Sequence, residues 1–178
     1  MTMYYIPSKH VYTYCFASCV ILLDTFLPIY SCLLLHTMQI MPTTCFIGFS
    51  DGASWCTQHL ASSAWALYTP TYSLLWQARV CIGPTTNNQA EYAAVTGLLA
   101  DAVRMGICDL QVHLDSQLIV VKLNGFYLVH NTVLRHSYLQ VLLLCRHFDT
   151  ITFVHIPRCD NASVDHLVNQ LLDWNLFH

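Results

Sequence analysis

The order of β-rich and helical segments constrains this chain more than any other feature of its sequence. An apolar run at residues 45–49 is followed by two β-rich runs at 63–69 and 73–82, which a turn-forming segment at 70–72 separates. The last two runs therefore predict a hairpin. The sequence indicates three consecutive strands before the first helix.

Helical and strand patterns alternate after the third predicted strand. Apolar residues recur at helical spacing from Asn88 to Met105, and Gly106 ends that run. The remaining predicted elements are a strand at 110–114, helices at 116–125 and 132–148, a strand at 151–156 and a final helix at 161–176. The order βββαβααβα is typical of a single α/β domain, which we place at residues 45–178.

The first 44 residues differ in composition from this domain. Hydrophobic residues make up 55% of the chain and charged residues only 10%, and much of the apolar excess lies at residues 11–41. That stretch is long enough to span a membrane, although Asp24 and Pro28 interrupt it. We therefore expect residues 1–44 to be an N-terminal extension that is a membrane anchor, a targeting segment or a disordered segment.

Cysteine usage and net charge limit the function classes. The nine cysteines contain no CxxC pair, which argues against a zinc ribbon and against a secreted disulfide framework. We expect an intracellular protein, in the nucleus or cytoplasm, with membrane association only through residues 11–41. The net charge of −3 argues against strong nonspecific binding of nucleic acid unless metal ions supply positive charge.

Four of the ten acidic residues lie at the ends of predicted elements. Asp51 and Asp115 each follow a strand, whereas Glu91 and Asp165 lie in the first turns of two helices. Taken singly, each acid has the simpler interpretation of a helix cap or a solvated strand end. Together they would meet at one edge of the sheet, because α/β folds place their chemistry where strands end.

A cluster of carboxylates has chemical consequences. The carboxylates repel one another and raise each other's pKa, so a stable cluster requires cations. Hard oxygen ligands select magnesium or manganese. A pair of such ions activates a water molecule and stabilises a leaving oxygen in phosphodiester cleavage.

Four motifs occur in the order and approximate spacing of the ribonuclease H family: DGAS (51–54), TTNNQAEY (85–92), LDSQL (114–118) and HIPRCDNASVDHLVN (155–169). The last motif most resembles the reverse-transcriptase-like ribonuclease H domains of plants and retrotransposons. This resemblance implies an α/β, ribonuclease H-like fold: a five-stranded mixed sheet, with three antiparallel strands and then parallel additions, flanked by helices. It also implies a monomer that hydrolyses the RNA strand of RNA–DNA hybrids endonucleolytically with two Mg²⁺ ions, which Mn²⁺ can replace, and with no small-molecule cofactor.

The resemblance assigns roles to individual residues. The four catalytic, metal-binding acids correspond to Asp51, Glu91, Asp115 and Asp165, and the auxiliary histidine corresponds to His155. The residues implied to contact nucleic acid are Gly52, Ala53, Ser54, Asn87, Asn88 and Gln117. His155 has the alternative of packing beside Pro157, and Gln117 that of a plain helix N-terminal residue.

The sequence also departs from the family. A glycine-rich turn usually follows the first aspartate, whereas residues 55–63 read WCTQHLASS, and the basic handle of bacterial relatives is absent between Gly125 and Leu134. Both departures predict weak substrate binding. Two alternatives therefore stay open: a catalytically weak or inactive nucleic-acid-binding or scaffold domain, and a mobile-element remnant.

Overall fold

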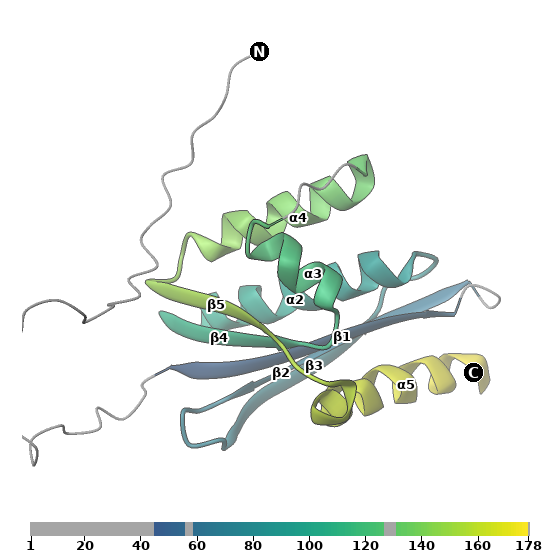
Figure 1. The fold of residues 1–178 in the computed structure, drawn as a ribbon. Helices are drawn as coiled ribbons and strands as arrows, with labels where there is room; N and C mark the ends of the chain where they lie inside the picture. The colour runs from purple at the N-terminus through teal and green to yellow at the C-terminus, as the bar shows by residue number, and fades with distance from the viewer. Residues whose placement is uncertain (1–44, 56–58, 127–130, 178) are drawn as a thin grey trace, which may run out of the picture. The chain divides into compact units, whose positions relative to one another are not determined.

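The structure, a computed structural model, describes residues 45–55, 59–126 and 131–177 (Figure 1). Its strands are β1 (Phe46–Trp55), β2 (Leu60–Tyr68), β3 (Leu74–Cys81), β4 (Asp109–Leu114) and β5 (Thr150–His155). Its helices are α2 (Asn87–Arg104), α3 (Gln117–Leu123), α4 (Thr132–Cys145) and α5 (Ala162–Phe177), with a 3₁₀ turn η2 (Arg158–Asn161) before α5. The order of elements agrees with the predicted one.

The five strands form one mixed sheet in the order β3-β2-β1-β4-β5. β1 pairs antiparallel with β2, and β2 pairs antiparallel with β3. β4 joins the other side of β1 in parallel, and β5 joins β4 in parallel. The predicted fold class, with three antiparallel strands followed by parallel additions, is confirmed.

Alternate residues of β2 feed two hydrophobic layers on opposite faces of the sheet. Trp65 and Leu67 pack into a core shared with α2, α3, α4 and β4. Ala64 and Ala66 pack against Val164, Val168 and Leu172 of α5. Figure 1 shows α5 on the face opposite α2, and the two-residue period of a strand is what allows β2 to serve both layers.

β1 and β2 are longer than the sequence predicted. We expected the first strand to end at residue 49 and the second to begin at 63, but the pairing of β1 with β2 runs from Ile47↔Tyr68 to Trp55↔Leu60. A hairpin keeps both strands extended because each continues to satisfy the backbone groups of the other. The expected loop at 55–63 is therefore mostly strand, apart from His59, at a φ of 54°, and residues 56–58, which lie outside the described part.

Two further expectations concern helices. The helix expected to run to residue 148 ends at Cys145. Among the described residues, no helix is both long and apolar enough to cross a membrane. The candidate anchor at residues 11–41 lies outside the described residues, so the prediction for residues 1–44 stays a prediction.

A buried carboxylate ties the edge strand β3 and its neighbour β2 to α2. Asp101 is 5% exposed, and its Oδ2 accepts hydrogen bonds of 2.7 Å from the indole nitrogens of both Trp65 and Trp76. Its Oδ1 pairs with Arg104 one turn along the helix. These partners satisfy a charge whose burial would otherwise be costly.

Replacement of Asp101 should destabilise the fold. Asp101→Ala leaves two indole N–H groups without an acceptor, one of them buried, so we expect the free energy of unfolding to fall by about 2 to 3 kcal/mol. Asp173→Ala, which removes an exposed acid from α5, serves as the matched control and should change it by less than about 0.5 kcal/mol. Urea denaturation of both variants measures the difference, and equal effects would contradict a structural role for the Asp101 network.

Candidate active site

Asp51 and Asp115 reach the same edge of the sheet from neighbouring strands. The parallel pairing of β1 with β4 ends at Phe49↔His113, and Asp115 directly follows β4. Asp51 lies two residues beyond that last parallel pair, opposite Ala64 of β2. We expected Asp51 to follow the end of its strand, and it lies within β1 instead. It is nevertheless at the carboxyl end of the parallel half, which is the position that matters for α/β sites.

The start of α2 brings Glu91 to this edge. Thr86 caps the helix, with its side chain accepting from the Gln89 backbone N–H and the Gln89 side chain accepting from the Thr86 backbone, so the predicted helix start is confirmed. Glu91, which we expected in the first turn, lies in the second, because the helix begins at Asn87. The Ser63 hydroxyl of β2 donates a hydrogen bond of 2.7 Å to the carbonyl of Ala90, which fixes this turn against the sheet.

Gly52 allows the closest contact between α2 and β1. A Cβ atom added at Gly52 would lie 2.2 Å from the carbonyl carbon of Ala90 and 2.4 Å from the nitrogen of Glu91. Both of these are backbone atoms, so they cannot move aside as a flexible side chain would. Glycine at this position is therefore required for Glu91 to lie beside Asp51.

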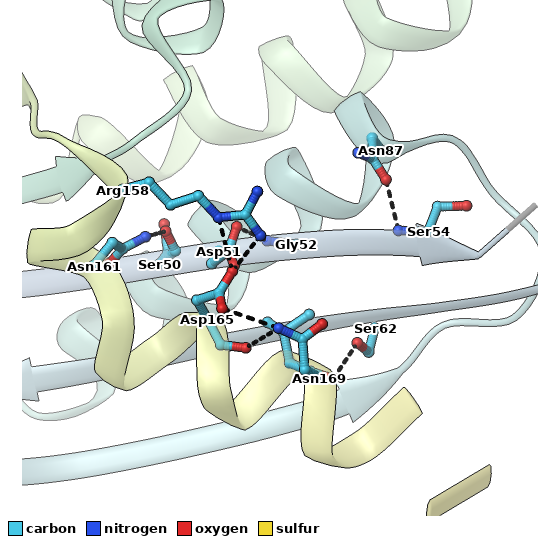
Figure 2. A network of polar contacts seen from close by, with 11 residues as sticks. Ser50, Asp51, Gly52, Ser54, Ser62, Asn87, Arg158, Asn161, Asp165 and Asn169 are labelled. Atoms are coloured by element: carbon cyan, nitrogen blue, oxygen red, sulfur yellow. Dashed lines mark hydrogen bonds and ion pairs between the residues drawn. The ribbon is translucent and has the colours of Figure 1, made fainter. Parts of the chain in front are cut away.

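Asp165 comes to the edge from the other face of the sheet. Asn161, which is fully buried, donates from its side-chain amide to the carbonyl of Ser50 at 3.1 Å. Farther along α5, the Ser62 hydroxyl donates to the carbonyl of Val168 at 3.0 Å. These two hydrogen bonds attach the start of α5 to β1 and β2 next to Asp51, as Figure 2 shows.

The four acids form one electrostatic cluster. The pKa of Asp51 is raised to about 6, chiefly by burial and also by the charges of Asp115 and Asp165, while the Gly52 N–H and Arg158 lower it. The pKa of Glu91 is raised to about 7, chiefly by burial and also by the charges of Asp51 and Asp115, while a hydrogen bond with Ser116 lowers it. These interactions link all four predicted acids at this edge, and their catalytic and metal-binding roles stay a prediction.

The oxygen atoms of this cluster are of the kind that a hard divalent cation binds. The described side chains do not, however, lie close enough together to hold one as they stand. Within the described ranges, no three His, Cys, Asp or Glu side chains gather closely enough to hold a metal ion. The Oε2 atom of Glu91 is buried without a hydrogen-bond partner, and the raised pKa of Asp51 reflects burial and repulsion that a cation relieves.

Arg158 is a site residue that the sequence reasoning missed. Its Nε and Nη2 donate to Oδ1 of Asp165 at 3.1 and 2.5 Å, and Asn169 donates to Oδ2 at 3.0 Å, so both oxygens of this carboxylate are engaged (Figure 2). Arg158 lies in η2, seven residues before Asp165. The signal in the sequence was a basic residue, one of only seven, inside the last motif.

His155 lies close to the cluster and is accessible. It is the last residue of β5, it is exposed, and its Nε2 lies 3.2 Å from the backbone carbonyl of Asp115. This contact places its ring beside the third acid and leaves it open to solvent. Its auxiliary role stays a prediction.

The residues predicted to contact nucleic acid differ in their exposure and in their hydrogen bonds. Asn87 is exposed at the start of α2, and its side-chain oxygen accepts from the Ser54 N–H at 2.6 Å. Ser54 also donates through its hydroxyl to the carbonyl of Thr85. These bonds join the end of β1 to the start of α2, beside the cluster, and Gly52 is buried beneath them.

The other predicted contacts are more scattered. Ala53 and Asn88 are half-buried near the same junction, and Gln117 is exposed as the first residue of α3. Nucleic-acid contact by any of these residues stays a prediction.

Comparison with known proteins identifies the family. The family profile described as "Reverse transcriptase-like" matches residues 49–171. The chain belongs to the reverse-transcriptase-like branch of the ribonuclease H family. The matched residues include all four acids.

Relatives of this ribonuclease H domain include proteins from an archaeon and a bacterium. Ribonuclease HI of Halobacterium salinarum is 33% identical over 125 residues, which are 70% of this chain and 63% of that protein. The bifunctional protein Rv2228c of Mycobacterium tuberculosis is 32% identical over 125 residues, 70% of this chain and 34% of that protein. The aligned region thus covers less than two thirds of either relative.

Solved structures of the family superpose well on this domain. RNase H1 of Halobacterium salinarum has a TM-score of 0.68 at 32% identity, covering 72% of this chain and 97% of that one. The N-terminal RNase H domain of rv2228c from Mycobacterium tuberculosis has a TM-score of 0.70 at 30% identity, covering 74% and 95%. LC11-RNase H1 in complex with an RNA/DNA hybrid has a TM-score of 0.68 at 29% identity, covering 74% and 99%.

Gly52 should tolerate no side chain in this ribonuclease H domain. Gly52→Ala forces a Cβ atom into the backbone of α2, so we expect a loss of about 3 kcal/mol or more in the free energy of unfolding. The matched control in the same strand is Gly48→Ala, whose Cβ would meet only the side chain of Leu98, at 2.7 Å. Because Leu98 can change rotamer, this control should lose about 1 kcal/mol. Similar losses in thermal and urea denaturation would contradict the requirement for backbone contact at Gly52.

The raised pKa of Asp51 predicts a pH dependence of stability in chelator. The pKa of Asp51 is about 6 in the folded protein against an ordinary 3.8, so between these values the folded state holds more protons than the unfolded state. Stability should therefore rise as the pH falls from 8 to 5. In Asp51→Asn this rise should be smaller by about 1 kcal/mol, whereas Asp149→Asn, an exposed acid before β5, should keep the full rise. Parallel slopes for all three proteins would show that Asp51 is not perturbed.

Proposed function

We propose that this protein is a metal-dependent endonuclease that hydrolyses the RNA strand of RNA–DNA hybrids. The observation that carries the proposal is the convergence of Asp51, Glu91 and Asp115 on one sheet edge, with pKa values of about 6 for Asp51 and about 7 for Glu91. Burial of mutually repelling carboxylates destabilises a fold, and strongly perturbed groups of this kind are typical of functional sites.

The family relationship supports the substrate class. A relative with 33% identity is a ribonuclease HI, and a solved structure with a TM-score of 0.68 is an RNase H1 in complex with an RNA/DNA hybrid. That structure covers 74% of this chain. A hybrid is therefore the substrate that we would test first.

The four acids would together serve as ligands for two divalent ions, Mg²⁺ or Mn²⁺. Asp51, Glu91, Asp115 and Asp165 supply the oxygen ligands that such ions prefer. When bound, the two ions would supply an activated water and charge stabilisation at the leaving oxygen. The unpartnered Oε2 of Glu91 would serve this purpose without the loss of a hydrogen bond.

The remaining residues would orient groups and move protons. The exposed imidazole of His155, held near the Asp115 carbonyl, is placed to exchange protons with solvent at the edge of the cluster. The guanidinium of Arg158 positions Asp165 and lowers the pKa of Asp51. The side chain of Arg158 is 74% exposed, so its guanidinium would also be accessible to a phosphodiester bound beside Asp165.

Recognition of the hybrid would fall to the junction of β1 and α2. Amide side chains such as those of Asn87 and Asn88 can sense the 2′-hydroxyl that distinguishes RNA from DNA. Asn87 is already oriented by its bond to Ser54, so its amide nitrogen is the group left to face a ligand. We propose that this junction reads the minor groove of the hybrid.

One observation favours a second candidate, a nucleic-acid-binding domain with weak or no catalysis. Arg158 and Asn169 occupy both oxygens of Asp165, and no ligand arrangement is formed by the described acids. In addition, only seven basic residues are available to the whole chain for phosphate contacts. Turnover of a hybrid is what separates the two candidates.

The decisive assay uses the full 178-residue chain on a labelled RNA–DNA hybrid. With Mg²⁺ or Mn²⁺ we expect cleavage of the RNA strand alone, and none with chelator. Asp115→Asn should lower the rate by about a hundredfold or more, because it removes an anionic oxygen ligand. The matched control, Asp149→Asn, changes an exposed acid at the opposite end of β5 and should retain the wild-type rate.

Duplex DNA and duplex RNA serve as substrate controls and should remain intact. A folded protein that binds the hybrid without cutting it in either metal would overturn the endonuclease and leave the binding domain. Cutting that survives Asp115→Asn would point to a contaminating nuclease.

A further inference from the structure

The edge strand β3 exposes an unusual amount of apolar surface. β3 forms one end of the sheet order, and Leu74, Leu75, Trp76 and Val80 are 52, 45, 42 and 40% exposed. The pairing with β2 is regular from Trp76 to Cys81, which puts Trp76 and Val80 on one face, and it shifts at Leu75, the extra residue of the irregularity. Exposed apolar patches of this kind commonly mark an interaction surface.

β3 has few of the features that keep edge strands from pairing, apart from a register shift confined to its first residues. Its eight residues, LLWQARVC, include no proline, no glycine and no lysine, and Arg79 is the only charged residue among them. In the part of the chain that the structure describes, no strand pairs with its outer side. The outward N–H and C=O groups of β3 are thus placed to accept another strand.

The side chains of β3 are complementary to those of a second β3. A two-fold axis perpendicular to the sheet places residues of the same face opposite each other, so the axis must pass through a residue position. With the axis at Ala78, Trp76 lies opposite Val80 and Gln77 opposite Arg79, all within the regular part of the strand. Each indole thus meets an apolar side chain, and each guanidinium meets an amide.

The neighbouring registers are less favourable. An axis at Arg79 places the two guanidinium groups directly opposite each other, and like charges in this position destabilise a sheet. An axis at Gln77 places Arg79 opposite the irregular start of the strand at Leu75, where it has no regular partner. The register centred on Ala78 is therefore the one that charge and polarity favour.

A cavity beside β3 fits the same register. It measures about 250 Å³ and is lined by Gln77, Ala78, Arg79, Leu167 and Gln170. Nη1 of Arg79 donates to Oε1 of Gln170 at 2.9 Å, which holds the guanidinium at the cavity wall. A Gln77 side chain from an opposing strand would enter at this wall and accept from the remaining N–H groups of Arg79.

We propose that β3 pairs antiparallel with β3 of a second copy of this chain, about Ala78, to form a continuous ten-stranded sheet. β2 separates β3 from β1, so the pairing leaves the carboxylate edge of each copy open. The resulting dimer carries two candidate active sites. It replaces the monomer that the family resemblance implied, and it holds whether or not the proposed nuclease activity does.

The first test is the mass of the full chain in solution. Sedimentation equilibrium should give twice the 20.3 kDa chain mass, and Val80→Lys should return the protein to one chain mass with an unchanged circular dichroism spectrum. Leu139→Lys is the matched control, since it changes a residue of α4 that is 46% exposed, and it should remain a dimer. A monomeric wild-type protein, or a dimer that only Leu139→Lys disrupts, would overturn the proposal.

The second test fixes the register without disturbing the fold. Under mild oxidation, Ala78→Cys should form a disulfide between position 78 of the two copies, identified by peptide mass spectrometry. Gln77→Cys is the control, because residue 77 lies on the other face of the strand and would face position 79, not position 77, of the partner. Cross-linking of both variants to the same extent, or of neither, would contradict the register centred on Ala78.

Discussion

The contact between the backbones of β1 and α2 at Gly52 is the constraint on which the rest of the structure depends. A Cβ atom at this position would overlap Ala90, so the helix can lie against the strand only where a side chain is missing. The same helix supplies Tyr92, Leu98 and other buried residues of the larger hydrophobic layer. The contact that brings α2 into the hydrophobic core thus also places Glu91 beside Asp51. A substitution at Gly52 would therefore change both the stability of the fold and the position of Glu91.

The carboxylate edge works against the stability that the two layers provide. Asp51 is 8% exposed, and Glu91 has a buried oxygen without a partner. The raised pKa of each group shows that burial disfavours its charged form. Neutral hydrogen bonds around them, from Asn161 to β1 and from Ser63 to α2, hold the backbone in place without relieving the repulsion. Arg158 provides a partial counter-charge. Such a local conflict between folding and chemistry is common at functional sites.

The sequence predicted the order of the elements and the meeting of the four acids because both depend on local patterns. Strand and helix periodicity can be recognised within short segments of sequence, and the four acids lie near the ends of the predicted strands and helices. The length of β1 could not be predicted in this way, since the strand continues only because β2 lies opposite it. Arg158 was missed for a similar reason. Its partner Asp165 is seven residues away, and only the turn of η2 into α5 brings the two side chains together.

The hydrogen bonds that Asp101 accepts from two tryptophans link the fluorescence of this domain to the packing of β3 against α2. Trp65 in the core and Trp76 on the edge strand donate to one carboxylate oxygen, whereas Trp174 on α5 is 64% exposed. Indole emission is sensitive to polarity and to nearby charge, so the first two tryptophans report on the strand edge and on α2 at once. Intrinsic fluorescence can therefore follow events at the rim of the sheet without any attached label, and a shift that leaves Trp174 unaffected would mark them as local.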